Sequence, residues 1–172
     1  IPIDPFYLAW KAREFDFSTR FVELAGEINL MMPYFVVGKA ERILGSQGKA
    51  LCGSRVLVLG AAYKRDIPDA RESPAIRIME LLTAEGAQVS YYDPLISKVR
   101  LTLGRGVAAT NNAVLHSVSL DEVSLNAADI VIIATDHSNV DYWLVAGHAK
   151  AVLDTRNVFG EVRPRSGRVW LL

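Results

Sequence analysis

Two short and almost wholly apolar runs constrain the fold of this 172-residue chain more than any other feature. Residues 55–60 read RVLVLG and residues 130–134 read IVIIA. Strands with one solvated face alternate apolar and polar side chains, whereas strands covered on both faces are apolar throughout. The two runs therefore predict inner strands of a parallel sheet that is covered by helices on both sides.

The segments around these runs alternate between helix and strand. Ser73 caps a predicted helix that ends at Gly86 and carries apolar side chains at helical spacing. Further helices are expected at 121–128 and 140–149, and further strands at 89–92, 151–154 and, as an edge, 168–172. A less regular region holds a turn at 104–106 and a possible strand at 115–118. The pattern predicts an α/β fold with a Rossmann-like, doubly wound, mostly parallel sheet.

The first part of the chain is expected to be helical. Asp4 and Pro5 form a helix start, with the carboxylate as cap and a helix over residues 6–14. A second, long helix should run from Ser18 or Thr19 to Leu44, with a kink or break at Pro33. We therefore divide the chain into a central helical segment, residues 1–48, and a Rossmann-like domain, residues 49–172.

Composition excludes several functions. Lys plus Arg equals Asp plus Glu at 19 each, so no overall field attracts nucleic acid or an anionic membrane. No apolar run is expected to be long enough to span a membrane. The single cysteine, Cys52, excludes an internal disulfide, fits a reducing cytoplasm and is expected to be a small buried thiol.

The three histidines lack ligand spacing, so no metal site is expected; His137, at a strand end, is the one histidine that could belong to a functional site. The first residue is Ile rather than Met, so we expect the natural protein to extend upstream.

Polar residues follow three of the predicted strands, at 60–69, 135–138 and 154–157. Parallel strands bind ligands outside their carboxyl ends, and the presence of Lys64 and Arg156 favours an anionic ligand. For any one loop an ordinary solvated turn is an equally good interpretation. Asp93 stands where a ribose-binding acid would stand, but Gly60 is not followed by G-x-G-x-x-G. The helix begins about a dozen residues after the strand, so we expect a Rossmann-like shape without its usual NAD site.

Taken in order, seven segments resemble the UDP-glucose/GDP-mannose dehydrogenase family. They are IPIDPFYL (1–8), ELAGEIN (23–29), GAAYKRD (60–66), DARESP (69–74), YDP (92–94), ATDH (134–137) and DTRN (154–157). Each is short, but together they span nearly the whole chain. The first segment, followed by WKAR at 10–13, is most similar to the UDP-N-acetylglucosamine branch.

The resemblance implies a two-step oxidation of a nucleotide sugar from alcohol to acid, with two NAD and a cysteine nucleophile. The family motif places that cysteine directly before position 1, and the main NAD-binding domain precedes it, so we expect this chain alone to be inactive. Asp4 matches the family's catalytic aspartate, which serves acid/base chemistry. Tyr63, Lys64 and Arg156 match contacts to the UDP-sugar, and Arg71 matches an arginine that reaches NAD. The helix over residues 19–44 matches the family's homodimer interface.

The sequence thus favours the C-terminal, substrate-binding part of an NAD-dependent UDP-sugar 6-dehydrogenase in the cytoplasm, without nucleic-acid or membrane partners. Two alternatives remain open at this point. One is a stand-alone nucleotide-binding module without redox activity, and the other is a fragment that serves only as a dimerising scaffold.

Overall fold

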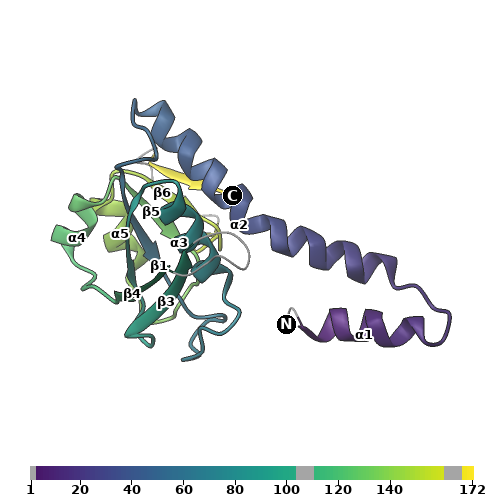
Figure 1. Ribbon diagram of the computed structural model, residues 1–172. Coiled ribbons are helices and arrows are strands. Elements are labelled where there is room, and N and C mark those ends of the chain that lie inside the picture. Colours follow the sequence, from purple (N-terminus) through teal and green to yellow (C-terminus); the bar gives the residue numbers. More distant parts are fainter. Residues whose placement is uncertain (1–2, 104–110, 161–167) are drawn as a thin grey trace.

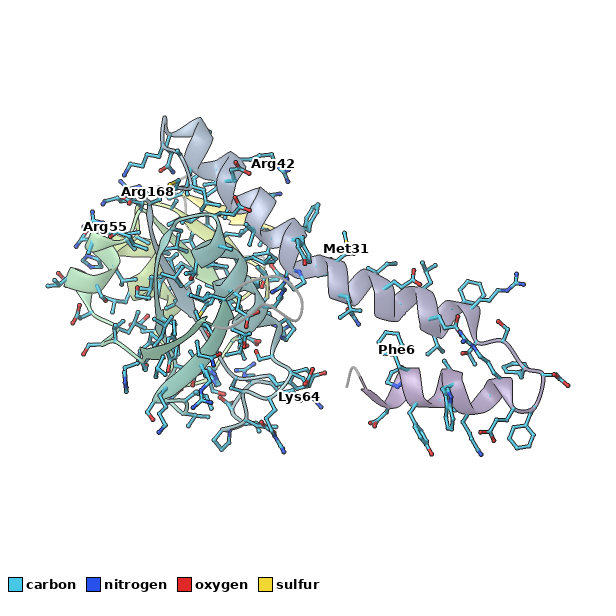
Figure 2. The ribbon with its side chains drawn as sticks, in the orientation of Figure 1. Phe6, Met31, Arg42, Arg55, Lys64 and Arg168 are labelled. Atoms are coloured by element: carbon cyan, nitrogen blue, oxygen red, sulfur yellow. The ribbon has the colours of Figure 1, made fainter. Side chains whose placement is uncertain are left out.

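Two helices form an arm that projects from an α/β body in the computed structural model, which describes residues 3–103, 111–160 and 168–172 (Figure 1). Helix α1 (Ile3–Arg13) packs beside the first half of α2 (Arg20–Ser46), and the second half of α2 lies on the body. Gly26 permits the close approach of the two arm helices, because a Cβ there would lie 2.4 Å from the Phe6 ring. Figure 2 shows Phe6 pointing from α1 toward α2.

The body contains a five-stranded sheet in the order β2-β1-β5-β6-β7, with all neighbours parallel. This confirms the predicted fold class, including the edge strand at the C-terminus. The strands are β1 (Arg55–Leu59), β2 (Gln88–Tyr92), β5 (Ile130–Ile133), β6 (Val152–Asp154) and β7 (Val169–Leu171), and the helices between them are α3 (Pro74–Ala84), α4 (Glu122–Ala127) and α5 (Tyr142–His148).

Both faces of the sheet are covered, as the apolar runs predict. Val56 and Val58 of β1 face one core, which includes α3 and the second half of α2. Leu57 and Leu59 face the other, which includes α4 and α5. Because α2 contributes Val36, Val37, Ala40, Ile43 and Leu44 to the first core, hydrophobic packing crosses the boundary predicted at residue 48.

The region that was expected to be less regular forms a two-stranded antiparallel ribbon of β3 (Lys98–Leu103) and β4 (Asn111–His116). β4 overlaps the possible strand predicted at 115–118, whereas β3 was not predicted. Its side chains alternate, with Val99 and Leu101 buried and Lys98 and Arg100 exposed, as in a strand covered on one face only. The turn predicted at 104–106 lies outside the described residues.

Two expectations concern helix α2. Of the kink or break expected at Pro33, the break is absent, because one helix runs from Arg20 to Ser46, and the buried side chains of the helix begin at Pro33. By length and composition alone α2 could also cross a membrane, with a mean hydropathy of 1.2, so the expectation that no run approaches such a span was wrong. Only 17% of the apolar window is buried, so most of it lies on the arm, whereas the second half of α2 packs in the core of the body.

Two smaller expectations need correction. Asp4 lies inside the first turn of α1, which begins at Ile3, rather than capping a helix that begins after it. A carboxylate in the first turn still interacts favourably with the helix dipole. Cys52 is exposed rather than buried, because it lies in the turn between α2 and β1, outside both cores.

Candidate functional site

The loops that follow β1, β5 and β6 lie side by side at the carboxyl edge of the sheet, because these strands are neighbours in it. The chain passes from β1 to β2 on one side and later enters β5 on the other side of β1. Open parallel sheets bind ligands at such a reversal of strand order. The three polar strand ends singled out in the sequence therefore belong to one site.

Asp93, directly after β2, fixes the start of the loop after β1. Its Oδ2 accepts hydrogen bonds from the backbone N–H groups of Ala61 at 2.7 Å and Ala62 at 3.0 Å. Its Oδ1 accepts from the N–H groups of Leu95 at 2.8 Å and Ile96 at 2.9 Å. Burial alone raises the pKa of the Asp93 carboxyl, but the hydrogen bonds from Leu95, Ala62 and Ala61, together with the nearby His137, outweigh it, so the pKa lies below its usual value.

This geometry shows how the first turn of the sheet differs from a dinucleotide site. The N–H groups that would face a pyrophosphate after β1 donate to Asp93 instead. Asp93 is only 4% exposed, so its carboxylate is not presented to a ribose. The described residues after β1 therefore do not fit the pyrophosphate of NAD.

Tyr63 and Lys64 follow this anchored turn. The Tyr63 N–H donates to the Asp69 carbonyl at 2.7 Å, which closes the loop on itself. The Lys64 ammonium lies 5.8 Å from the centre of the Tyr63 ring, within range of a cation–π contact. Figure 2 shows Lys64 at the rim of the body, where the exposed ammonium is accessible to a ligand.

The Asp136 carboxylate links Arg156 to the loop that carries Lys64. Its Nε donates to Asp136 Oδ1 at 3.0 Å, and the Arg65 guanidinium lies 3.6 Å from Asp136 Oδ2. The loops after β1, β5 and β6 are thus linked by one acid between two cations. Lys64 lies on the same loop as Arg65 and is exposed, so the edge carries Lys64 in addition to the two arginines that share Asp136.

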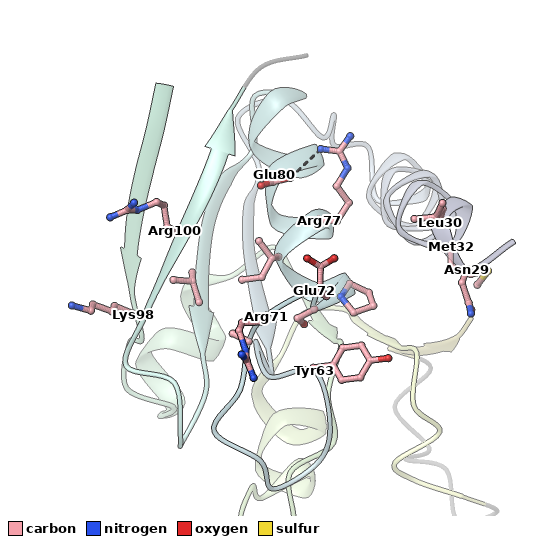
Figure 3. Close-up of a pocket in the computed structure, with 15 residues that line it drawn as sticks. Asn29, Leu30, Met32, Tyr63, Arg71, Glu72, Arg77, Glu80, Lys98 and Arg100 are labelled. Atoms are coloured by element: carbon pink, nitrogen blue, oxygen red, sulfur yellow. Dashed lines mark hydrogen bonds and ion pairs between the residues drawn. The ribbon is translucent and has the colours of Figure 1, made fainter. Parts of the chain in front are cut away.

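Tyr63 and Arg71 line a cavity of about 790 Å³ between α2, α3 and β3 (Figure 3). Arg71 is held by both oxygens of Asp69, and its hydrogen bonds lower the pKa of Asp69 to about 2. The wall of this cavity carries three further cations that sequence reasoning missed, namely Arg77, Lys98 and Arg100. Lys98 and Arg100 could have been found by predicting strand β3, because apolar and charged residues alternate along it. Lys64 and Arg156 lie on the sheet edge and are not among the residues that line this cavity.

Asp4 lies on the arm. It is exposed and lines an apolar groove of about 710 Å³ between α1 and α2. Asn29 and Leu30 of α2 line this groove and also the cavity with Tyr63 and Arg71. The groove beside Asp4 and the cavity of the body thus share one wall, formed by α2. Within the ranges that the structure describes, no three His, Cys, Asp or Glu side chains are grouped as metal ligands.

Comparison with known proteins identifies the family of this chain. Residues 57–161 match the UDP-binding domain of the UDP-glucose/GDP-mannose dehydrogenase family. The UDP-N-acetyl-D-mannosamine dehydrogenase of Methanocaldococcus jannaschii is 30% identical over 167 residues, covering 92% of this chain and 33% of that protein. Its counterpart in Pyrococcus horikoshii is 31% identical over 166 residues, covering 94% of this chain and 35% of that protein.

Solved structures give the same result. The UDP-N-acetylmannosamine dehydrogenase from Pyrococcus horikoshii aligns with a TM-score of 0.75 at 25% identity, covering 99% of this chain and 37% of that one. A GDP-mannose dehydrogenase from Pseudomonas aeruginosa, at 15% identity and a TM-score of 0.63, shares the fold. The chain spans about a third of the length of the curated relatives it matches.

Proposed function

Since the chain belongs to the UDP-glucose/GDP-mannose dehydrogenase family, we propose that its sheet edge binds the UDP part of a nucleotide sugar for an NAD-dependent 6-dehydrogenase. The observation that carries this proposal is the pairing of Arg65 and Arg156 with Asp136 at the reversal of strand order, with Lys64 exposed on the same loop as Arg65. A diphosphate brings at least two negative charges, and cations on two different loops can hold both of them. Tyr63 offers an aromatic ring and a hydroxyl beside Lys64 for the uridine or the sugar.

The complete reaction would oxidise the primary alcohol of the sugar to an acid in two steps. NAD, when bound, accepts a hydride in each step. Within this chain, Asp4 would position water and take or give a proton near the reacting carbon, and Arg71 would contact the cofactor. The residues that surround Asp93 offer no pyrophosphate site, which supports a cofactor bound mainly outside the sheet described here.

The substrate we propose is a UDP-N-acetylhexosamine, with UDP-glucose as the second candidate. The relatives from Methanocaldococcus and Pyrococcus carry the name UDP-N-acetyl-D-mannosamine dehydrogenase, whereas residues 1–8 and 10–13 resemble the N-acetylglucosamine branch. UDP-N-acetylmannosamine and UDP-N-acetylglucosamine share the UDP and the acetamido group, so the site residues proposed here serve either epimer. The product would be the corresponding uronic acid nucleotide, a precursor for a surface polysaccharide.

We also propose that the chain forms a homodimer through the helix over residues 19–44. The first half of α2 exposes large apolar side chains that a lone helix would leave in water: Phe21, Leu24, Ile28, Leu30, Met31, Tyr34 and Phe35. Each large side chain buried against a partner stabilises by roughly 1.5–3 kcal/mol. Leu24, Ile28, Met31 and Phe35 also line one apolar groove of about 590 Å³, which supports a single contact face.

Calorimetric titration with UDP tests the proposed site. Lys64→Ala and Arg156→Ala should each weaken UDP binding by roughly ten- to a hundredfold, because each removes a charge-assisted hydrogen bond. Arg156→Lys should restore binding only partly if the guanidinium contacts two phosphate oxygens. The matched control is Arg168→Ala, which removes an exposed arginine at the amino end of β7, on the opposite edge of the sheet.

The titration has two outcomes that contradict the proposal. One is a wild-type chain that does not bind UDP. The other is a wild-type chain that binds UDP while Lys64→Ala and Arg156→Ala bind it equally well. A small loss that disappears in moderate salt would mark both residues as ordinary exposed cations, because salt screens such charges.

A further inference from the structure

His137, in the loop after β5, is a buried polar group to which the proposed UDP site gives no role. Its ring is 1% exposed. The Asp66 backbone N–H donates to His137 Nδ1 at 3.0 Å. Because a backbone N–H can only donate, Nδ1 must be the unprotonated nitrogen, and Nε2 then carries the proton. Nε2 lies 3.1 Å from Asp93 Oδ2, so it donates to that carboxylate.

The two ends of the ring connect separate parts of one loop. Asp93 holds the N–H groups of Ala61 and Ala62, before Lys64, and His137 holds the N–H of Asp66, after it. The loop segment with Tyr63 and Lys64 is therefore fixed at both ends by two side chains that are bonded to each other.

Asp66 shows that this second attachment holds the loop in an unfavourable backbone conformation. Its φ of 59° lies in the left-handed region, which costs a non-glycine residue free energy unless its surroundings impose it. The Asp66 carboxylate accepts hydrogen bonds from the N–H and the hydroxyl of Ser138, the residue after His137. Residues 137 and 138 together thus determine where the loop turns.

We propose that His137 is a positioning residue, which acts through the Asp66 N–H to hold the loop after β1 in the conformation that presents Lys64 and Tyr63 to the ligand. The proposal rests on the function proposed above for those two residues. A side chain at this position needs an acceptor toward Asp66 and a donor toward Asp93. A neutral imidazole supplies both from one rigid buried ring, at opposite sides.

Two amide substitutions test the hydrogen bonds at the two ends of the ring separately. In His137→Asn the amide reaches the place of Nδ1 and can still accept from Asp66, whereas in His137→Gln it reaches the place of Nε2 and can still donate to Asp93. Hydrogen exchange of the Asp66 amide reports the first bond directly. We expect exchange to be faster by about tenfold or more in His137→Gln and to change much less in His137→Asn. The amides of Ala61 and Ala62, bonded to Asp93, should stay protected in both.

UDP titration of the same variants measures the functional consequence. His137→Gln should weaken binding by about tenfold, and His137→Asn should stay within about threefold of wild type. If His137 only filled the core, the loss of UDP affinity in each variant would follow its loss of stability in urea, with no difference between Asn and Gln beyond that. Such a result overturns the proposal. So does unchanged Asp66 exchange in His137→Gln.

A measurement on the unaltered chain covers the case in which both variants fail to fold. The imidazole ¹⁵N chemical shifts of His137 should show the tautomer with the proton on Nε2. A proton on Nδ1 would be incompatible with the Asp66 bond and would overturn the proposal. If the wild-type chain does not bind UDP, the UDP site is refuted, while the exchange and tautomer results still decide whether His137 holds the loop.

Discussion

Asp129, at the amino edge of the sheet before β5, offers a quantitative test of the electrostatics of the fold. The carboxylate is 7% exposed and accepts a hydrogen bond from the Lys49 ammonium at 2.6 Å. It also accepts from the Arg55 N–H at 2.9 Å, and the Lys150 ammonium lies at 3.5 Å. One acid therefore joins the linker before β1 to the starts of β1 and β6.

The size of the effect follows from the pKa of Asp129. Burial alone raises this pKa, but the hydrogen bonds from Lys49 and Arg55 outweigh it and hold the value at about 2, against 3.8 in an unfolded chain. One pKa unit corresponds to about 1.4 kcal/mol, so the charged carboxylate contributes about 2 kcal/mol to the free energy of unfolding at neutral pH. As the pH falls, the unfolded chain takes up the proton first. The contribution is therefore complete above about pH 5 and is lost between about pH 4 and pH 2.

The perturbation that tests this is Asp129→Asn, which keeps an acceptor for the Arg55 N–H and removes the charge. Urea unfolding at pH 7 should show a loss of about 2 kcal/mol, and the loss should shrink steadily below pH 4. Asp141→Asn is the matched control, because Asp141 is an exposed cap of α5 and Asn caps helices about equally well. A loss of the same size at pH 7 and at pH 3 would refute the electrostatic reasoning and indicate altered packing.

Three further predictions follow from the same contacts. Gly60→Ala should destabilise by at least about 2 kcal/mol in urea unfolding, because φ is +84° and the added Cβ would lie 2.4 Å from the Thr135 carbonyl oxygen; an unchanged midpoint would contradict this. Ser73→Ala, which removes the cap on the first turn of α3, should cost about 1 kcal/mol by the same assay, and no loss would contradict the capping role. Ile28→Asp should convert a dimer into a monomer in sedimentation at tens of micromolar, whereas Val123→Asp, on exposed α4, should not; a wild-type monomer would refute the proposed interface.

The strands could be predicted from sequence wherever a local pattern determined them. β1, β5 and β6 are covered on both faces, so nearly all of their residues are apolar, and that signal does not depend on the rest of the chain. β3 carries the weaker alternating pattern of a strand covered on one face, and it was missed. Cys52 was placed in the core on its residue type, whereas its exposure depends on where the chain turns between α2 and β1.

The site could be predicted as a set of strand ends but not as a set of contacts. Lys64 and Arg156 are separated by more than ninety positions, and the acid that links their loops, Asp136, lies between them in sequence. The bond between Asp93 and His137 spans 44 positions and exists only because β2 and β5 flank β1. The sequence placed each of these residues at a strand end, but predicting which of them contact each other required the order of the strands in the sheet.

The same strand order explains how a chain with no net charge can present a cationic edge. Two acids at this edge, Asp93 and Asp154, are almost fully buried and direct their oxygens at backbone N–H groups of the loops that follow them. Their negative charge is thereby neutralised locally by peptide dipoles rather than by lysine or arginine side chains. Asp136 is shared by Arg65 and Arg156, and Lys64, on the same loop as Arg65, is exposed. Counting charges along the sequence gives zero, but Asp93 and Asp154 are turned inward, whereas Lys64, Arg65 and Arg156 stay exposed at this edge.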